Sequence, residues 1–145
     1  MSAKIDNVEI DVKHIQKKFS AIRKPDRRLI VEGAGGLMVP VNDTVLFVDL
    51  IRALNIPVII VTNQYLGSIN HALLTSMALE VNKIPVLGWI FNGNYLTNEE
   101  DILQRSPFPK IGRIETEEEV DKGMIKKYAD RLRPALEAVL RNFQR

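Results

Sequence analysis

The hydrophobic residues of this chain gather in short unbroken runs, and between the runs they recur every three to four positions. Residues 28–31, 57–61 and 85–91 form runs without polar alternation, and each contains branched apolar residues. Such runs are typical of strands that are buried on both faces of a parallel sheet. The short segment at 110–114, after the prolines at 107 and 109, predicts a fourth strand.

The segments between these runs have the spacing of amphipathic helices. The spacing predicts helices at residues 11–22, 44–54, 68–81 and 98–105, and a C-terminal helix that Pro134 breaks or restarts. The expected N-caps are Asp11, Thr44, Ser68 and Thr97. This alternation of strands and helices predicts one α/β domain over residues 1–145, with a parallel sheet flanked by helices.

The predicted helix at 68–81 has apolar residues on two sides. They are Ile69, Leu73 and Met77 on one side, and Leu74, Ala78 and Val81 on the other. Burial on both sides predicts a subunit interface or a central helix. His71 has no acidic or nucleophilic partner in the sequence pattern, so we interpret it as a packing residue.

Polar residues and glycines directly follow three of the predicted strands. Glu32 and the turn at 33–36 follow the first, a polar loop at 62–67 follows the second, and Asn92-Gly93 follows the third. Parallel strands end at one edge of a sheet, where open α/β proteins place their ligands. Glycines allow backbone amides to approach a phosphate, and one carboxylate beside them suits a hydrated magnesium ion. The simpler interpretation is that Glu32 caps a turn that the glycines merely form.

Two further segments at this predicted edge have both a functional and a structural interpretation. The first amides of the helix at Ser68 can hold an anion, with Asn70 adding a contact, or both residues are simple caps. The side-chain amide of Asn92 can read the edge of a base because it offers a donor and an acceptor, or it belongs to an Asn-Gly turn. The acidic residues at 115–119 are explained most simply as charges near the start of the last helix.

Composition and charge narrow the classes of function. The 145 residues are 46% hydrophobic and 26% charged, which is typical of a soluble globular protein. The lack of cysteine excludes disulfides, thiolate metal sites and cysteine nucleophiles. Two histidines argue against a histidine-rich metal site, and a net charge of +2 argues against nucleic acid as a partner. No apolar run is long enough for a membrane and no signal peptide is recognised, so we expect a cytoplasmic protein.

Three segments together carry a resemblance to a known family: residues 32–36 (Glu-Gly-Ala-Gly-Gly), 66–71 (Leu-Gly-Ser-Ile-Asn-His) and 88–92 (Gly-Trp-Ile-Phe-Asn). In order and spacing they resemble dethiobiotin synthetase, the ATP-dependent carboxylase of the biotin pathway, from about residue 3 to the C-terminus. The resemblance implies a P-loop NTPase-like fold and a homodimer that uses ATP and Mg2+. Its substrates would be 7,8-diaminononanoate and CO2, which become dethiobiotin through a carbamate, a mixed anhydride with the γ-phosphoryl group, and ring closure.

The resemblance also implies roles for individual residues. Glu32 would be a magnesium ligand. The ATP site would comprise Glu32, Gly33, Ala34, Gly35, Asn92, Gly93, Glu115, Thr116 and Glu117, with Asn92 and Gly93 at the adenine. The substrate site would comprise Gly35, Leu66, Gly67, Ser68, Ile69 and Asn70, and residues 67–70 would hold the substrate carboxylate from the partner subunit. The family usually has a proline where this chain has Glu115, so the segment 115–117 departs from the family pattern.

One feature of the family is missing from the sequence. No GxxxxGK[ST] motif occurs in the 145 residues, and the catalytic lysine and magnesium-binding aspartate of the family would lie upstream, so no catalytic residue is assigned. We expect an incomplete P-loop fold without its first strand, similar to the C-terminal two-thirds of a synthetase. Such a chain would have negligible ATP turnover alone, and its two exposed sheet edges would favour aggregation or pairing with a complementary P-loop-bearing chain. The alternatives are a non-catalytic dimerisation or binding module derived from a synthetase, and a related P-loop ATPase of the partitioning or amidase type.

Overall fold

The computed structural model describes residues 5–6, 8–63, 65–94 and 98–143 of the chain. The chain forms two compact units, Met1–Ile56 (the first unit) and Pro57–Arg145 (the second unit), and each is described by itself. The prediction of one domain stays a prediction. None of the described helices is long and apolar enough to cross a membrane.

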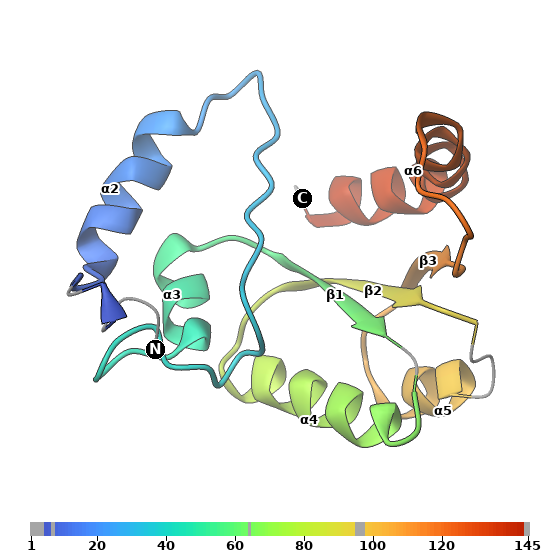
Figure 1. The fold of residues 1–145 in the computed structure, drawn as a ribbon, viewed down its shortest axis with the longest axis horizontal. Helices are drawn as coiled ribbons and strands as arrows, with labels where there is room; N and C mark the ends of the chain where they lie inside the picture. The colour runs from blue at the N-terminus through green and yellow to red at the C-terminus, as the bar shows by residue number, and fades with distance from the viewer. Residues whose placement is uncertain (1–4, 7, 64, 95–97, 144–145) are drawn as a thin grey trace. The chain divides into compact units, whose positions relative to one another are not determined.

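The first unit is built around two helices, α2 (Val12–Ile22) and α3 (Phe47–Leu54) (Figure 1). Asp11 caps α2 as predicted, because its Oδ1 accepts a hydrogen bond at 2.8 Å from the backbone amide two residues on. Gln16 Nε2 on α2 donates to the carbonyl oxygen of Ala53 on α3 at 2.7 Å. Through this hydrogen bond and the packing of the two helices, α2 near the start of the first unit contacts α3 near its end.

The start of α3 shows that the predicted N-cap Thr44 was wrong. The side chain of Asn42 accepts hydrogen bonds from the backbone amides of Thr44 at 3.0 Å and Val45 at 2.9 Å. These bonds form an Asx turn, which competes with helix formation. The helix follows Leu46, whose amide donates to Asp49 Oδ2 at 3.0 Å.

The prediction of a strand at 28–31 was also wrong, because this segment is irregular and exposed. Ile30 is 91% exposed. A strand forms only where a neighbouring strand receives its backbone hydrogen bonds. In the described part of the first unit, the one pairing of this kind is an isolated bridge between Pro40 and Leu46. Branched apolar residues are therefore not enough to make residues 28–31 a strand.

The second unit contains a parallel sheet in the order β1-β2-β3, formed by Val58–Asn63, Val86–Asn92 and Lys110–Ile114. Helices α4 (Ser68–Val81) and α5 (Asn98–Arg105) cover one face, and α6 (Lys122–Phe143) covers the other (Figure 1). This arrangement confirms the predicted α/β fold, and the predicted limits of α5 and β3 are those observed.

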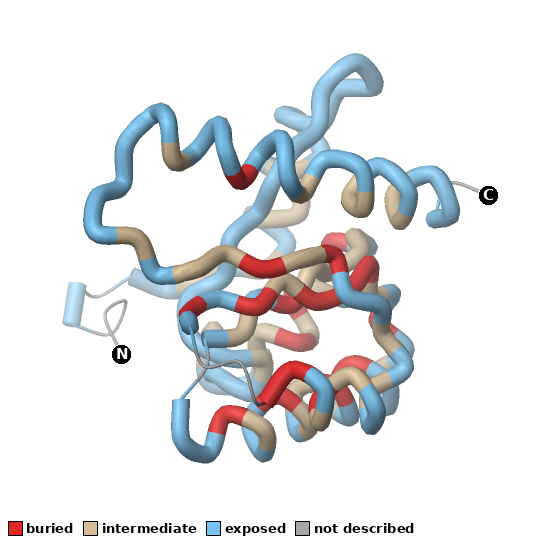
Figure 2. The backbone as a smooth tube through the Cα atoms, turned by 90° about the vertical axis from the view of Figure 1, so that its right-hand side faces the viewer, coloured by how far each residue is buried: buried red, intermediate tan, exposed pale blue. Residues whose placement is uncertain are grey.

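The core of the second unit lies around the central strand β2, as the buried residues in Figure 2 show. Trp89 and Phe91 are both fully buried, and their rings stack with centroids 6.0 Å apart. Trp89 Nε1 donates to Ser106 Oγ at 3.0 Å, so the indole has its polar partner inside the core. A β-carbon at Gly112 of β3 would lie 2.2 Å from Leu132 Cδ2, so the glycine allows α6 to approach the sheet closely.

The last helix, α6, differs in one detail from the prediction. α6 continues through Pro134 rather than breaking there, although an interior proline removes one backbone hydrogen bond. α6 begins after Asp121, whose Oδ1 accepts from the amide of Met124 at 2.7 Å, so the acidic residues at 115–119 lie just before the start of the helix.

Candidate functional site

The carboxyl ends of the three strands lie side by side at one edge of the sheet, called the carboxyl edge below. The parallel register places Asn63 of β1 beside Asn92 of β2, and Asn92 beside Ile114 of β3. Asn92 is exposed at the middle of this edge. Among the described residues its side-chain amide has no hydrogen-bond partner, so a donor and an acceptor face outward together.

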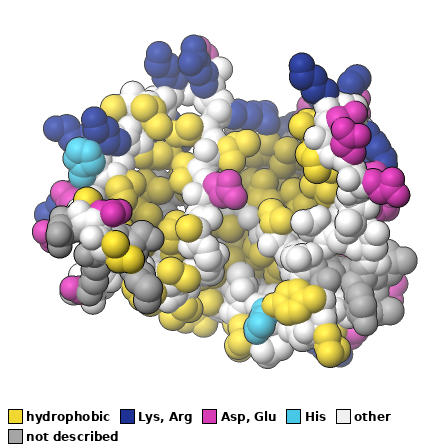
Figure 3. All heavy atoms as spheres, viewed as in Figure 1, with side chains coloured by type: hydrophobic (Ala, Val, Ile, Leu, Met, Phe, Trp, Pro, Cys, Tyr) yellow, Lys and Arg dark blue, Asp and Glu magenta, His cyan; other side chains and the backbone are white. Residues whose placement is uncertain are grey.

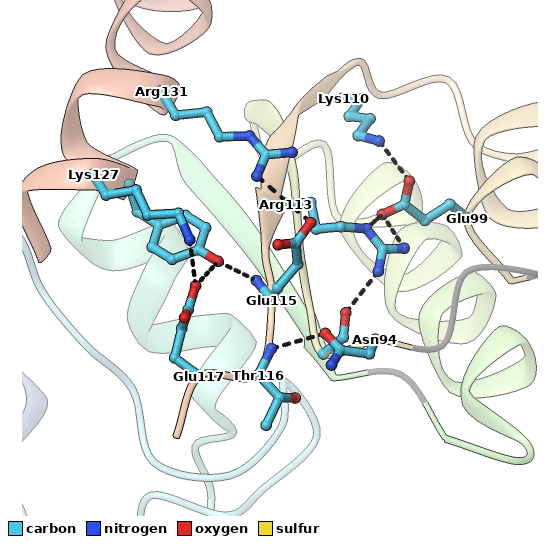
Figure 4. A network of polar contacts seen from close by, with 11 residues as sticks. Asn94, Glu99, Lys110, Arg113, Glu115, Thr116, Glu117, Lys127 and Arg131 are labelled. Carbon is cyan, nitrogen blue, oxygen red and sulfur yellow. Dashed lines mark hydrogen bonds and ion pairs between the residues drawn. The ribbon is translucent and has the colours of Figure 1, made fainter. Parts of the chain in front are cut away.

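The two loops that leave the carboxyl edge next to Asn92 are joined by hydrogen bonds (Figure 4). The amide of Gly93 donates to the carbonyl oxygen of Ile114 at 2.9 Å. The amide of Thr116 donates to Asn94 Oδ1 at 2.9 Å. The predicted site residues Asn92, Gly93 and Thr116 therefore lie together, and the structure holds their backbones in place.

Beneath these loops, an ion pair between Glu99 of α5 and Arg113 of β3 lies in the interior (Figure 4). Arg113 Nε donates to Glu99 Oε1 at 2.6 Å, and Arg113 Nη1 donates to the carbonyl oxygen of Gly93 at 2.6 Å. The second carboxylate oxygen of Glu99 accepts from Lys110 Nζ. Sequence reasoning missed this pair. Its only signal is that Arg113 shares the buried face of a short strand with Ile111, two residues before it.

The predicted residues Glu115 and Glu117 are held against α6. Glu117 Oε1 accepts from Lys127 Nζ at 2.7 Å and from the hydroxyl of Tyr128 at 2.6 Å, and the same hydroxyl accepts from the amide of Glu115 at 3.1 Å. The hydrogen bonds from Lys127 and then Tyr128 lower the pKa of Glu117. The hydrogen bond to Glu117 raises the pKa of Lys127 in turn. This network fixes the β3–α6 loop beside the carboxyl edge.

The predicted substrate segment lies at the start of α4. Gly67, with φ +94°, is the N-cap, so the prediction that Ser68 caps this helix was wrong. Ser68 is instead buried, and its Oγ accepts from Asn98 Nδ2 at 2.9 Å. Asn70 is exposed in the first turn and Ile69 is half-buried.

The residues around this helix start are mostly at the surface. Leu66 is 90% exposed, and exposed apolar side chains lie beside a histidine over this end of α4 (Figure 3). His71 is also exposed, and its Nδ1 is hydrogen-bonded to the hydroxyl of Tyr65, so the interpretation of His71 as a packing residue was wrong. The histidine finds a partner six residues back, across the turn that precedes the helix.

The predicted magnesium ligand Glu32 and the glycines after it belong to the first unit. Glu32, Gly33 and Ala34 are exposed in an irregular segment. Gly35 has φ +78°, and a β-carbon there would lie 2.8 Å from Val39 Cγ2, so this position requires glycine. The structure places Asn92 and Gly93 beside the segment 115–117 and residues 66–70 at the start of α4, whereas Glu32–Gly35 are described in a separate unit.

The part of the chain that the structure describes has no group of three or more His, Cys, Asp or Glu residues that could hold a metal ion. Glu32 offers one exposed carboxylate. A magnesium ion keeps several waters and takes one or two carboxylates together with phosphate oxygens, so a single carboxylate fits it when nucleotide is bound. Glu32 would hold the ion, and the ion would neutralise phosphate charge.

The chain is similar to known proteins over most of its length. The family model of the AAA domain matches residues 1–123. The ATP-dependent dethiobiotin synthetase BioD of Christiangramia forsetii is 38% identical over 136 residues, which are 93% of this chain and 63% of that protein. BioD of Cytophaga hutchinsonii is 43% identical over 120 residues (79% and 57%), and BioD of Agrobacterium fabrum is 39% identical over 115 residues (79% and 52%).

These matches confirm the resemblance seen in the sequence. The aligned parts span between 52% and 63% of the length of these relatives. The three-stranded parallel sheet with helices on both faces agrees with the fold that the family match indicates. The chain therefore belongs to the AAA-domain family with its P-loop NTPase-like fold, and it is a dethiobiotin synthetase-like protein.

Proposed function

We propose that this chain forms the base-binding and substrate-binding part of a dethiobiotin synthase, an ATP-dependent ligase of biotin biosynthesis in the cytoplasm. One amine of 7,8-diaminononanoate adds to CO2 and loses a proton, which gives a carbamate. A carbamate oxygen attacks the γ-phosphorus of ATP, and ADP leaves. The second amine then attacks the carbonyl carbon, loses a proton and expels phosphate, which closes the ureido ring of dethiobiotin.

The observation that carries the proposal is the exposed side-chain amide of Asn92 between the ends of β1 and β3. Adenine carries a donor at N6 next to an acceptor at N7, and an asparagine amide is complementary to this pair. Gly93 and the segment 115–117 would lie along the base, as the family resemblance implies. The relatives named ATP-dependent dethiobiotin synthetase support the same nucleotide.

The start of α4 would hold the carboxylate of 7,8-diaminononanoate. The first amides of a helix and its dipole favour an anion, and Asn70 is exposed in the first turn. The Ser68 hydroxyl is already bonded to Asn98, and its amide donates to the carbonyl oxygen of Tyr65 at 3.0 Å. The backbone amides of Ile69 and Asn70 and the Asn70 side chain are therefore the groups that remain to bind the ligand. In this proposal they act on the substrate of the partner subunit in a homodimer.

The phosphates of ATP would be held by residues outside these 145, since no GxxxxGK[ST] motif occurs among them. Catalysis of phosphoryl transfer rests on positioning and on neutralising charge at the phosphates. We therefore propose that the chain needs a complementary P-loop-bearing segment or chain for turnover.

The test is phosphate release from Mg-ATP with 7,8-diaminononanoate and bicarbonate. The chain is assayed alone and mixed with the N-terminal segment, including the P-loop, of the Christiangramia forsetii relative. We expect phosphate release only in the mixture. In the mixture, Asn92→Ala should lower kcat/KM for ATP by about tenfold or more, since one bidentate contact with a base contributes about 1–3 kcal/mol. Asn142→Ala, at an exposed position near the end of α6, is the control. If the chain is folded and the mixture releases no phosphate, the proposal is contradicted.

A second candidate function, a non-catalytic dimerisation module, is favoured by one surface of α4. Leu74, Met77 and Val81 are 55%, 60% and 80% exposed and follow one another along the helix. Sedimentation equilibrium of the chain with and without Leu74→Glu tests this surface. A dimer that the variant disrupts, together with silence in the phosphate-release assay, would favour the module over the synthase.

A further inference from the structure

The Glu99–Arg113 pair is deeply buried, with side chains that are 10% and 6% exposed. A buried ion pair loses the hydration of both charges, and replacing it with apolar residues is often neutral or stabilising. A gain in stability therefore does not explain why this ion pair lies in the interior. The contacts of Arg113 suggest a different role for the pair.

Arg113 connects three elements of the second unit. Its Nε and Nη2 contact the carboxylate of Glu99 on α5, and its Nη1 donates to the carbonyl oxygen of Gly93 at 2.6 Å. The amide of Gly93 is bound at the same time to the carbonyl oxygen of Ile114. Both polar groups of the Gly93 backbone are thus held by β3. Because Gly93 follows Asn92 directly, the direction of the Asn92 backbone is fixed as well.

We propose that Arg113, oriented by Glu99, is a positioning residue that sets the base specificity of the site at Asn92. The inference rests on the proposed function, in which Asn92 recognises adenine. With its backbone held here, the Asn92 side chain meets adenine with its amide oxygen at the N6 donor and its NH2 group at N7. Guanine has acceptors at both O6 and N7, so it faces the amide oxygen with a repulsive contact. A loosened Gly93 lets Asn92 reorient and donate to guanine, and the preference is lost.

The choice of variants separates positioning from folding. Arg113→Met alone leaves Glu99 in the interior with the more exposed Lys110 as an ion-pair partner, which lowers stability by itself. The double variant Glu99→Met/Arg113→Met removes both charges and keeps apolar volume, so it folds while the bond to Gly93 is gone. Lys110→Met is the matched control, because Lys110 pairs with the same carboxylate, whereas the backbone of Gly93 is bonded to Arg113 and Ile114.

The experiment is an NMR titration of the 15N-labelled chain with AMP and, separately, with GMP, followed at the side-chain amide of Asn92. We expect the wild type and Lys110→Met to bind AMP about tenfold more tightly than GMP, as one bidentate contact predicts. We expect the double variant to bind both nucleotides within about twofold of each other. The exchange rates of the Gly93 and Thr116 amides without nucleotide are a second readout, and both rise in the double variant.

The outcomes distinguish the two ideas. A wild type that prefers AMP and a double variant that keeps this preference would overturn the positioning role and leave the proposed function standing. A wild type that binds neither nucleotide at Asn92 would overturn the base site and the inference with it. Unchanged exchange of Gly93 in the double variant would overturn the role of Arg113 in fixing the loop, whatever the nucleotide data show.

Discussion

Two motifs of the same kind, Glu32-Gly33 in the first unit and Asn92-Gly93 in the second, have different surroundings. Each has a polar residue and then a glycine after a run of apolar residues. Asn92 ends a strand whose neighbours on both sides are paired with it, and Gly93 is held by two hydrogen bonds to β3. Glu32 follows an irregular, exposed segment. The comparison shows that a strand-end motif becomes an ordered edge only where the neighbouring strands receive its hydrogen bonds.

The strongest way to break the ordered edge is to leave its buried charge unpaired. Arg113→Met should lower the free energy of unfolding by about 3–5 kcal/mol, because Glu99 then loses its buried partner and keeps the more exposed Lys110. The double variant with Glu99→Met should recover most of this loss. Urea unfolding followed by the fluorescence of Trp89 measures both. A double variant as unstable as the single one would show that the pair itself stabilises the fold.

A matched pair of core and surface substitutions tests the comparison directly. Ile111 of β3 is 4% exposed, whereas Ile30 of the predicted strand at 28–31 is 91% exposed. Ile111→Ala should cost about 3 kcal/mol through the lost burial and the cavity left behind. Ile30→Ala should change the free energy of unfolding by no more than about 0.5 kcal/mol. Equal losses in urea unfolding would mean that residues 28–31 are buried in solution.

A smaller effect is expected at the loop next to Asn92. Asn94→Ala removes the hydrogen bond that the Thr116 amide donates to Asn94 Oδ1, and such a bond contributes about 1 kcal/mol. Thermal unfolding measures the loss, with the exposed Asn70→Ala as the control. If Thr116 exchanges its amide proton no faster in the Asn94 variant, the two loops are not joined through this bond.

The smallest expected effect is a change in how steeply the stability decreases at acidic pH. The pKa of Glu117 is lowered in the folded chain, so its contribution to stability is present above its ordinary value of 4.5. The contribution is lost as the pH falls through the lowered pKa. Glu117→Gln should therefore flatten the decrease of the unfolding temperature in that pH range, with Glu118→Gln, an exposed neighbour, as the control. A steeper decrease for Glu117→Gln than for the wild type would contradict the sign of the shift.

The sequence predicted the elements whose signals are local. Asp11 marks the start of α2, and the limits of α5 and β3 are those observed, because capping and short apolar runs act within a few residues. The parallel α/β arrangement followed from the alternation of such elements.

The predictions that failed concern residues whose structure depends on partners distant in sequence. Ser68 is bonded to Asn98, 30 residues away, so it does not cap its helix. Residues 28–31 have strand composition without a neighbouring strand in the described part of their unit. The buried pair Glu99–Arg113 joins residues 14 apart on different elements. No local pattern reports such contacts, whereas the positions of Asn92 and Gly93 at a strand end were predicted correctly.

The most direct test of the base site is a titration of the 15N-labelled chain with Mg-ATP, in which every assigned amide is followed. The account predicts the largest shifts at Asn92 and Gly93 and at residues 114–117, because the base lies at the carboxyl edge that these residues form. Shifts confined to other parts of the chain, with Asn92 unmoved at saturation, would contradict it.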